Sequence, residues 1–494
     1  MQKFNRTILT AVKNMQHFLL KPRASAALLF GIVMSSAAVF STIYPILAVV
    51  LSISTVILLF FILKTELSYY LLIILLNLSS IGFFKVIHQK LYLYPLGDLF
   101  ILIVFLLWGF SRAANLAKPY SKTPCDISLL LFVGLSILSL LWSDDYKSWM
   151  YQFLRLSFGL GAFLVTILLI NNHKILNTAI WIIIIMGVLN SIICFVSIYT
   201  YPDYTHIKLF ESKYANFVIF FNDTSVVGKR GHAFAHPLTT AYWLNFALIL
   251  SFGKFITIQG YKKLVLCFLM FLMLTAHLTT LSKTPLLALI AGLIFFFYSY
   301  KPIRKVFFIS VGVLIVVIGV SFILANITDL ENSTRYTYNQ LTGYNEYSSS
   351  TSRMDWWTTS VKKSLESYGL GVGLGGTPKY LTPIKIPHSH INAPHSHNVW
   401  VNTFGDLGFI GLGLLVLIYF FAFKSYVAAL RQCKNEYYKR ILLSYISGFV
   451  IMLLFILTDY DYTATILWWY MGLGFAIARL ATEATPEYRG LNFV

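Results

Sequence analysis

Charged residues are scarce in this sequence, and acidic residues are the scarcest. Only 12% of the 494 residues are charged, with 19 Asp and Glu against 38 Lys and Arg, whereas a soluble globular domain is about 25% charged. Hydrophobic residues make up 57% of the chain, and its mean hydropathy is +0.72. This composition excludes a soluble protein and predicts one that lies in a membrane.

Cysteine is also rare, which bears on how the chain is held together. All four cysteines fall in apolar runs or basic connections: Cys125, Cys194, Cys267 and Cys433. This placement argues against a disulfide framework. We expect no cleavable signal peptide either, because the apolar segment after Pro22-Arg23 continues directly into further apolar segments.

Long apolar runs fill most of the remaining sequence. Many reach 18 residues or more, which is enough to cross about 30 Å of hydrocarbon. They are continuous rather than alternating, which favours helices over barrel strands. We predict an all-α polytopic membrane protein with about 12–14 transmembrane helices and a large extracytoplasmic loop between the spans 306–325 and 399–423. The expected limits of the spans are 24–43, 45–63, 67–87, 96–111, 127–142, 154–171, 177–200, 232–252, 264–281, 284–300, 306–325, 399–423, 441–458 and 464–480.

The net charge of +19 does not indicate nucleic-acid binding in this chain. The basic residues lie mostly in short connections between apolar spans, where the positive-inside bias places them. With a cytoplasmic N-terminus, 23 of the 38 basic residues fall on the cytoplasmic side, in short loops dense in charge. We therefore expect both termini in the cytoplasm and no nucleic-acid partner.

One polar stretch interrupts the apolar pattern, from Asn326 to His397. It is 72 residues long, whereas loops beyond about 12–15 residues are usually functional or disordered. Its tryptophans, Trp356 and Trp357, and a glycine-rich run at 369–376 indicate a folded cap. We divide the chain into transmembrane helices at 1–325, a large periplasmic loop carrying the active site at 326–397, and C-terminal helices with a cytoplasmic tail at 398–494.

Counting crossings places four polar residues in one compartment. Arg230 precedes the span 232–252, and two crossings later the chain reaches Lys283. After two further crossings the chain reaches the long loop, which contains Arg353 and His397. These residues share a side in either orientation of the chain, and the positive-inside bias makes that side extracytoplasmic.

The positions of the three cations, Arg230, Lys283 and Arg353, can also be interpreted without a functional role. Arg230 can be an interfacial arginine whose charge reaches the lipid headgroups, and Arg353 can pair with Asp355 on a solvated helix. Lys283 is harder to explain in this way, because it interrupts about 37 nearly uncharged residues close to the outer interface. An unpartnered cation there is costly, so we favour a functional role for it.

Arg155 enters a span from the same side as these residues. It follows Asp144 and Asp145 in the sequence. An ion pair with one of these aspartates is our preferred interpretation, and a position lining a substrate path is the alternative.

A histidine-rich run closes the long loop, with His388, His390, His395 and His397. The run holds no Asp, Glu or Cys that would complete a tetrahedral zinc site, so we predict no metal. His397 stands apart because it directly precedes a span, where an imidazole is held at the membrane surface and can accept a proton near neutral pH. The run 371–376 matches GxGxxG without a surrounding strand-helix unit, and we interpret it as a tight turn.

Four local patterns occur in order in the C-terminal two thirds of the chain. They are Arg230-Gly-His-Ala-Phe-Ala-His-Pro, Leu281-Ser-Lys-Thr-Pro, Ser352-Arg-Met-Asp-Trp-Trp followed by Gly369-Leu-Gly-Val-Gly, and His397-Asn398 followed after nine residues by Gly408-Phe-Ile-Gly. In order and spacing they resemble the O-antigen ligase and polymerase superfamily of bacterial envelope proteins. The family usually has arginine where this chain has Lys283, and lysine keeps the charge but loses the bidentate fork.

The resemblance implies glycosyl transfer from an undecaprenyl-diphosphate-linked glycan, by single displacement with inversion and without a cofactor or metal. Fixed cations would stabilise the negative charge that grows on the leaving diphosphate, and a base would take the proton of the acceptor hydroxyl. We predict His397 as the catalytic base and Arg230, Lys283 and Arg353 as the donor-binding cations. Supporting positions are Arg155, His395 and Asn398.

The leading expectation is an O-antigen ligase in the bacterial inner membrane, multi-pass, with its active site facing the periplasm. Its partners would be the lipid-linked donor, lipid A–core or another glycan as acceptor, and membrane lipids. The related polymerase, which joins lipid-linked repeat units, is the first alternative, and an O-linked protein glycosyltransferase is the second. A transporter, with Arg155 and Lys283 lining a path, is the alternative from another class.

Overall fold

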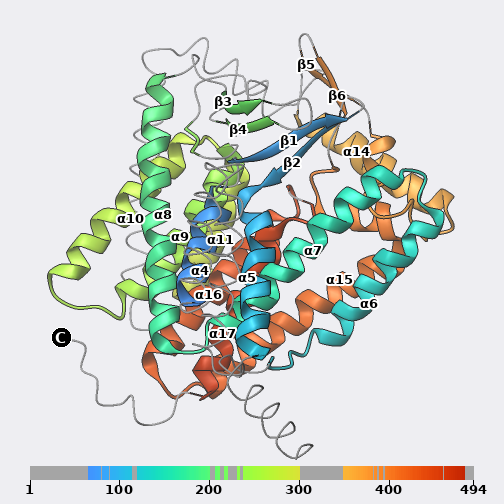
Figure 1. The fold of residues 1–494 in the computed structure, drawn as a ribbon. Coiled ribbons are helices and arrows are strands. Elements are labelled where there is room, and N and C mark those ends of the chain that lie inside the picture. The colour runs from blue at the N-terminus through green and yellow to red at the C-terminus, as the bar shows by residue number, and fades with distance from the viewer. Residues whose placement is uncertain are drawn as a thin grey trace, which may run out of the picture.

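The computed structural model describes residues 65–78, 81–87, 90–113, 120–200, 206–211, 216–220, 231–233, 237–300, 349–381, 383–386, 389–392, 395–459 and 461–483. Long helices dominate these residues and form a bundle, with the strands gathered near one end (Figure 1). The helices are α4 (Thr65–Asn77), α5 (Leu96–Ala113), α6 (Asp126–Leu138), α7 (Tyr146–Leu169), α8 (His173–Thr200), α9 (Pro237–Phe255), α10 (Tyr261–Thr279), α11 (Lys283–Ser299), α14 (Ser349–Glu366), α15 (Val399–Gln432), α16 (Glu436–Phe455) and α17 (Thr465–Glu483), with 3₁₀ turns η1 (Ser139–Trp142) and η3 (Thr377–Lys379).

Five of the described helices are long and apolar enough to cross a membrane, namely α7, α8, α10, α15 and α16. Four shorter apolar helices lie among them, at Glu66–Asn77, Leu96–Leu106, Asp126–Trp142 and Lys283–Ser299. The predicted class, a polytopic helical membrane protein, is confirmed. The expected spans 24–43, 45–63 and 306–325 lie outside the described residues.

Two small antiparallel sheets occupy the connections at one end of the bundle. The first has the strand order β2-β1-β4-β3 and joins β1 (Ile81–Ile87) and β2 (Lys90–Pro95) to β3 (His206–Glu211) and β4 (Asn216–Phe220). The second is the hairpin of β5 (Pro383–Ile386) and β6 (Ser389–Asn392). The expected span 67–87 is therefore wrong in its second half, because a short apolar strand and an apolar helix have the same hydropathy.

Helix α17 lies at the centre of the bundle, where it packs against α7, α15 and α16. Its residues Trp468, Trp469 and Tyr470 are fully buried, and the ring of Phe246 stacks on Tyr470 at a centroid distance of 3.9 Å. Gly472 faces the backbone of Phe163, so the lack of a side chain there lets α17 approach α7 closely. This packing fixes the connection that enters α17, residues 456–464.

The connection into α17 meets the start of α15 at one end of the bundle. The Val399 amide donates to the Ile456 carbonyl at 2.9 Å, which joins the first residue of α15 to the end of α16. At the start of α9, Tyr242 stacks on Phe455 at the end of α16 with ring centroids 4.4 Å apart, and Asn245 donates to the Pro285 carbonyl in the first turn of α11 at 2.9 Å. The N-terminus of α11 therefore lies at the same end of the bundle as the C-terminus of α16. The segments predicted to carry the site therefore converge at this end.

Candidate active site

His397 lies in the turn before α15, with its imidazole against a carboxylate from another part of the chain. Its Nδ1 is 2.8 Å from Oδ1 of Asp459, in the connection between α16 and α17. The His397 side chain is 23% exposed and that of Asp459 is 10% exposed. The imidazole also stacks on Trp356 of α14, with ring centroids 5.4 Å apart. This arrangement orients the ring through Nδ1 and leaves Nε2 to meet a substrate proton.

The backbone at His397 is held in an unusual conformation. Its φ of 52° lies in the left-handed region, which costs a residue with a side chain about 1–2 kcal/mol. The turn is held on both sides, because Trp357 Nε1 donates to the Ser396 carbonyl at 2.8 Å and the Val399 amide donates to Ile456. Strain that the surroundings enforce in this way is concentrated at functional sites.

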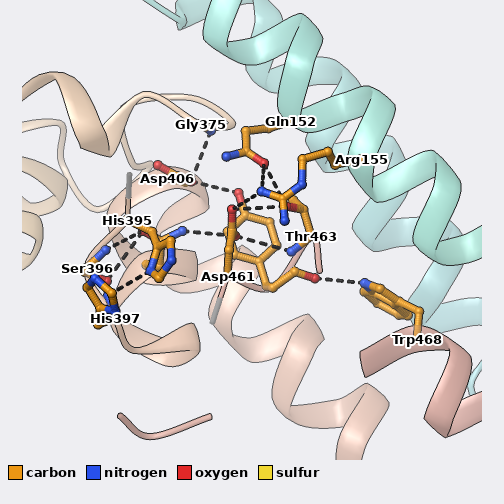
Figure 2. A network of polar contacts seen from close by, with 12 residues as sticks. Gln152, Arg155, Gly375, His395, Ser396, His397, Asp406, Asp461, Thr463 and Trp468 are labelled. Atoms are coloured by element: carbon orange, nitrogen blue, oxygen red, sulfur yellow. Dashed lines mark hydrogen bonds and ion pairs between the residues drawn. The ribbon is translucent and has the colours of Figure 1, made fainter. Parts of the chain in front are cut away.

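His395 is the second histidine that the fold brings to this site. Its Nδ1 accepts a hydrogen bond from the His397 amide at 3.0 Å, and the two ring centroids are 4.3 Å apart (Figure 2). Burial, and then the neighbouring His397, hold the pKa of His395 well below its usual range. His395 is therefore neutral near pH 7 and holds the backbone of His397. Of the other histidines of the run, His388 lies outside the described residues and His390 lies in β6.

Asn398, the next residue, begins helix α15. Its side-chain oxygen accepts hydrogen bonds from the amides of Trp400 at 3.0 Å and Val401 at 3.1 Å. This is an N-cap, which typically stabilises a helix by about 1 kcal/mol. Asn398 thus sets where α15 starts, one residue after His397, and its supporting role in the reaction stays a prediction.

Arg353 lies in α14, where the charge of the same carboxylate acts on its guanidinium. Burial lowers its pKa, and the charge of Asp459 acts in the opposite direction. Asp355, the partner considered from the sequence, is exposed and forms no ion pair with Arg353, because residues two apart point in different directions on a helix. The structure thus places the charge of Arg353 near the His397–Asp459 pair.

Lys283 is the first residue of α11 and is exposed. It forms no ion pair with any residue in the described part of the chain. A cation at a helix N-terminus is unfavourable, because that end already carries partial positive charge. The preceding turn is also strained, with a φ of 50° at Leu281. The exposed ammonium group of Lys283 is therefore accessible to an anionic ligand, and its donor-binding role stays a prediction.

Arg230 lies outside the described residues, but its neighbour Gly231 is described. The Gly231 amide donates to the Thr279 carbonyl at 2.8 Å, and Thr279 ends α10, four residues before Lys283. The chain at Gly231, the residue after Arg230 in the sequence, thus meets the turn between α10 and α11 that precedes Lys283.

Arg155 pairs with an aspartate distant in sequence instead of with Asp144 or Asp145. Its Nη1 is 3.6 Å from Oδ2 of Asp461. Asp145 caps α7 by accepting from the Ser148 amide, while Asp144 accepts from the Tyr380 hydroxyl at 2.7 Å. Ten residues of helix rise by about 15 Å, so Arg155 is too far along α7 to reach either aspartate.

Asp461 is the centre of a saturated polar cluster (Figure 2). Its side chain is 2% exposed. Besides Arg155, it accepts from Asn402 Nδ2 at 3.2 Å and lies 3.0 Å from the hydroxyl of Thr463. Asn402 comes from α15 and Arg155 from α7, so this one carboxylate joins three segments beneath the His397 turn.

The glycine-rich run wraps around another buried carboxylate, that of Asp406 in α15. Asp406 accepts from the amides of Gly375 at 3.0 Å and Thr377 at 2.9 Å, from the Tyr462 hydroxyl at 2.8 Å, and from the Thr377 hydroxyl. Gly375 has a φ of 69°, and a Cβ there would collide with Gln152. The tight turn expected at 371–376 is therefore a cradle of backbone amides for Asp406, a known use of such turns for anions.

Sequence reasoning missed Asp459, Asp461 and Asp406. Asp459 and Asp461 fall between the expected spans 441–458 and 464–480, and the crossing count places that connection on the side of His397. Counting crossings would therefore have placed both aspartates on the same side of the membrane as His397. It gives no indication that His397 meets Asp459 and Arg155 meets Asp461, because neighbours across 62 or more residues are set by packing.

The assembled groups define what the site can do. An imidazole oriented by a carboxylate can accept a proton from a hydroxyl, and nearby fixed cations can stabilise a departing anion. The site also contains three side chains that could hold a metal ion, those of His395, His397 and Asp459. Each offers one ligand atom, and the three atoms lie within 4.8 Å of one another.

Residues 268–416 match the family model described as O-Antigen ligase. No curated protein matches the chain. Among solved structures, one titled "Structural coordination of polymerization and crosslinking by a peptidoglycan synthase complex" contains a chain that matches at 14% identity with a TM-score of 0.44, over 74% of this chain and 99% of that one.

The family match covers Lys283, Arg353 and His397, three of the residues singled out from the sequence. It also includes the Gly408-Phe-Ile-Gly pattern and the glycine cradle of Asp406. The match shows that residues 268–416 resemble the O-antigen ligase family, within a chain whose described part has a helical membrane fold.

Proposed function

We propose that this chain is a glycosyltransferase of the O-antigen ligase type. It moves a glycan from undecaprenyl diphosphate to a sugar of lipid A–core, at the periplasmic face of the bacterial inner membrane. The observation that carries the proposal is the 2.8 Å contact between His397 Nδ1 and Asp459 Oδ1 beside a partly exposed imidazole. The family match supports the reaction class.

In the proposed reaction His397 is the general base. The acceptor hydroxyl attacks the anomeric carbon of the donor sugar while its proton passes to Nε2 of His397. Asp459 accepts a hydrogen bond from the Nδ1–H of His397, which fixes the tautomer with a free Nε2 lone pair and stabilises the imidazolium that forms. The bond from the anomeric carbon to the diphosphate oxygen breaks with both electrons going to oxygen, so a single displacement inverts the carbon.

The leaving diphosphate gains negative charge as this bond breaks. Lys283, with no ion pair to a described residue, and Arg353, beside Asp459, are the cations that would meet it, together with Arg230. Because the charge on the diphosphate is greater in the transition state than in the bound donor, fixed cations lower the barrier. The positive N-terminal end of α11 adds to the charge of Lys283.

The decisive experiment uses purified full-length protein, a lipid-diphosphate-linked glycan as donor and lipid A–core as acceptor. His397→Ala should reduce transfer by about 10²–10⁴-fold, the usual contribution of a general base. The matched control is His173→Ala, at the start of α8 and the opposite end of the bundle, which should leave transfer unchanged. Transfer by His397→Ala at the rate of the unaltered protein would refute the base assignment.

Deleting the gene identifies the acceptor class. Full-length polymer stranded on the lipid carrier indicates a ligase, whereas single repeat units on the carrier indicate a polymerase. Unchanged carrier-linked glycan in the deletion, with transport of a solute lost, would refute a transferase and favour a transporter.

A further inference from the structure

The site combines three metal-ligating side chains that the sequence separates. One nitrogen each of His395 and His397 and one oxygen of Asp459 lie within 4.8 Å of one another. The histidine-rich run holds no acidic residue of its own, and the fold provides one from 62 residues further along. The reason for excluding a metal from the sequence alone therefore does not apply to the folded chain.

The ligand set selects a class of ion. Two imidazoles and one carboxylate suit Zn²⁺ and similar divalent transition metals, whereas Mg²⁺ and Ca²⁺ need a shell of oxygens. Arg353 and Arg155 both act electrostatically on this cluster and repel any cation. Only an ion with strong affinity for imidazole nitrogen is expected to overcome this repulsion.

We infer that His395, His397 and Asp459 form a binding site for a divalent transition-metal ion such as Zn²⁺, and that the bound ion blocks glycosyl transfer. The binding stands on the geometry of the three residues. The block rests on the proposed function, in which His397 is the base.

The geometry needs only a small adjustment to accept the ion. His397 Nδ1 and Asp459 Oδ1 are 2.8 Å apart, whereas two ligands of tetrahedral Zn²⁺ are about 3.4 Å apart for bonds of about 2.1 Å. The ion thus replaces the proton that these two atoms share, and the His395 ring must move toward it. That movement sacrifices the hydrogen bond from the His397 amide to His395 Nδ1 if the metal takes that nitrogen.

Either mode of binding at His397 removes the base. An ion on Nε2 occupies the lone pair that would receive the acceptor proton. An ion on Nδ1 leaves the proton of the neutral imidazole on Nε2, so that nitrogen can no longer accept one. With the ion on Nδ1, Asp459 also changes from orienting the imidazole to ligating the ion. Bound metal is therefore an inhibitor here and has no part in the transfer itself.

Metal binding is tested first, with no activity assay. Full-length protein in detergent is stripped with EDTA, dialysed, and titrated calorimetrically with Zn²⁺ alone. We expect one tight site per chain, weakened at least tenfold in His395→Gln and in Asp459→Asn. The matched control His173→Gln, at the opposite end of the bundle, should keep the site. Tight binding that neither His395→Gln nor Asp459→Asn weakens, or no tight site at all, would overturn the assignment.

Inhibition is tested in the transfer assay with the same preparations. Zn²⁺ at saturation should slow the unaltered protein at least tenfold, and EDTA should restore the rate. His395→Gln should lose this sensitivity relative to its own zinc-free rate. Binding without slower transfer, or faster transfer with Zn²⁺, overturns the inhibitory role. If the zinc-free protein transfers no glycan at all, the proposed function fails while the binding result stands by itself.

Discussion

Asp459 and Asp461 are two residues apart in one short connection, yet their surroundings are opposite. Asp459 meets a partly exposed imidazole, and its own side chain is 10% exposed. Asp461 is 2% exposed and shares its oxygens among Arg155, Asn402 and Thr463. One carboxylate faces a group that can react, and the other is enclosed by groups that satisfy it.

The two carboxylates therefore have different roles: Asp461 positions the chain, and Asp459 faces the group that can react. A buried carboxylate with a full set of donors fixes the segments that bind it, and Asp461 joins α7, α15 and the connection into α17. Because the connection is fixed, Asp459 is presented to His397 at a defined distance. The rigid cluster at Asp461 therefore serves the more open pair at Asp459 and His397.

Replacing Asp459 should have the largest effect on transfer. Asp459→Asn keeps the shape of the side chain but removes the charge that orients and stabilises the imidazole. We expect kcat to fall by about 10²–10⁴-fold, with the apparent melting temperature in detergent nearly unchanged. The measurement is transfer to lipid A–core beside thermal unfolding of the same preparation.

The control for this change is Asp355→Asn, at an exposed aspartate of α14. It should leave both transfer and unfolding as they are. If Asp459→Asn transfers glycan within twofold of the unaltered protein, the contact with His397 is not part of the reaction, and the contrast between the two aspartates disappears.

Replacing Asp461 should lower stability more than any other change at the site. Asp461→Ala leaves the guanidinium of Arg155 and the amide of Asn402 without their carboxylate in a buried setting. Removing one partner of a buried ion pair costs about 3–5 kcal/mol, measured as the free energy of unfolding in detergent. Asp144→Ala is the control, because its side chain is 61% exposed, and it should cost below about 1 kcal/mol. Equal stability of both variants would show that the Asp461 cluster is not structural.

Most of the described helices could be predicted from hydropathy, and the exceptions have physical reasons. The expected span 399–423 is the start of α15, which continues to Gln432 because its polar last turns remain good helix formers beyond the apolar part. Residues 81–87 form a strand in place of a helix end, since hydropathy does not report the neighbouring strands that complete its hydrogen bonds.

Only those site residues that belong to local sequence motifs could be predicted. His397 was found because it stands at the entry to a span within a family pattern, and its role stays a prediction. The partner of Arg155 was sought among its sequence neighbours, whereas packing of α17 on α7 brings Asp461 to it. Asp406 gave no local signal, because the purpose of the glycine run is visible only when the carboxylate it encloses is in place.

A moderate effect of pH on stability should come from His395. Its folded-state pKa lies well below 6.5, so below pH 6.5 the unfolded chain takes up a proton that the folded site excludes. The stability of the folded protein is therefore complete above pH 6.5 and falls with decreasing pH, by at most about 1.4 kcal/mol per pH unit from this residue. His395→Gln cannot titrate, and its side-chain oxygen can accept the His397 amide.

The measurement is the free energy of unfolding in detergent between pH 7.5 and pH 5. The decrease for His395→Gln should be smaller than for the unaltered protein, while at pH 7.5 the two should agree within about 1 kcal/mol, the value of one hydrogen bond. Parallel pH curves would mean that the folded protein does not lower the pKa of His395 and does not hold this histidine neutral.

Exchanging Lys283 for arginine should have the smallest effect and tests the cationic side of the site. Lys283→Arg keeps the charge at the start of α11 and adds a bidentate fork, so transfer should stay within about threefold. Lys283→Ala removes the charge, and transfer should fall by about 10²-fold, the lower end for one fixed group facing a developing anion.

Lys262→Ala, at an exposed lysine at the other end of α10, controls for loss of a surface charge. Because the charge on the diphosphate grows as the bond breaks, the loss in Lys283→Ala should appear mainly in kcat. If Lys283→Ala and Lys262→Ala behave alike, the exposed cation at α11 is not opposite the leaving diphosphate, and Arg353 and Arg230 are the proposed cations that remain to stabilise it.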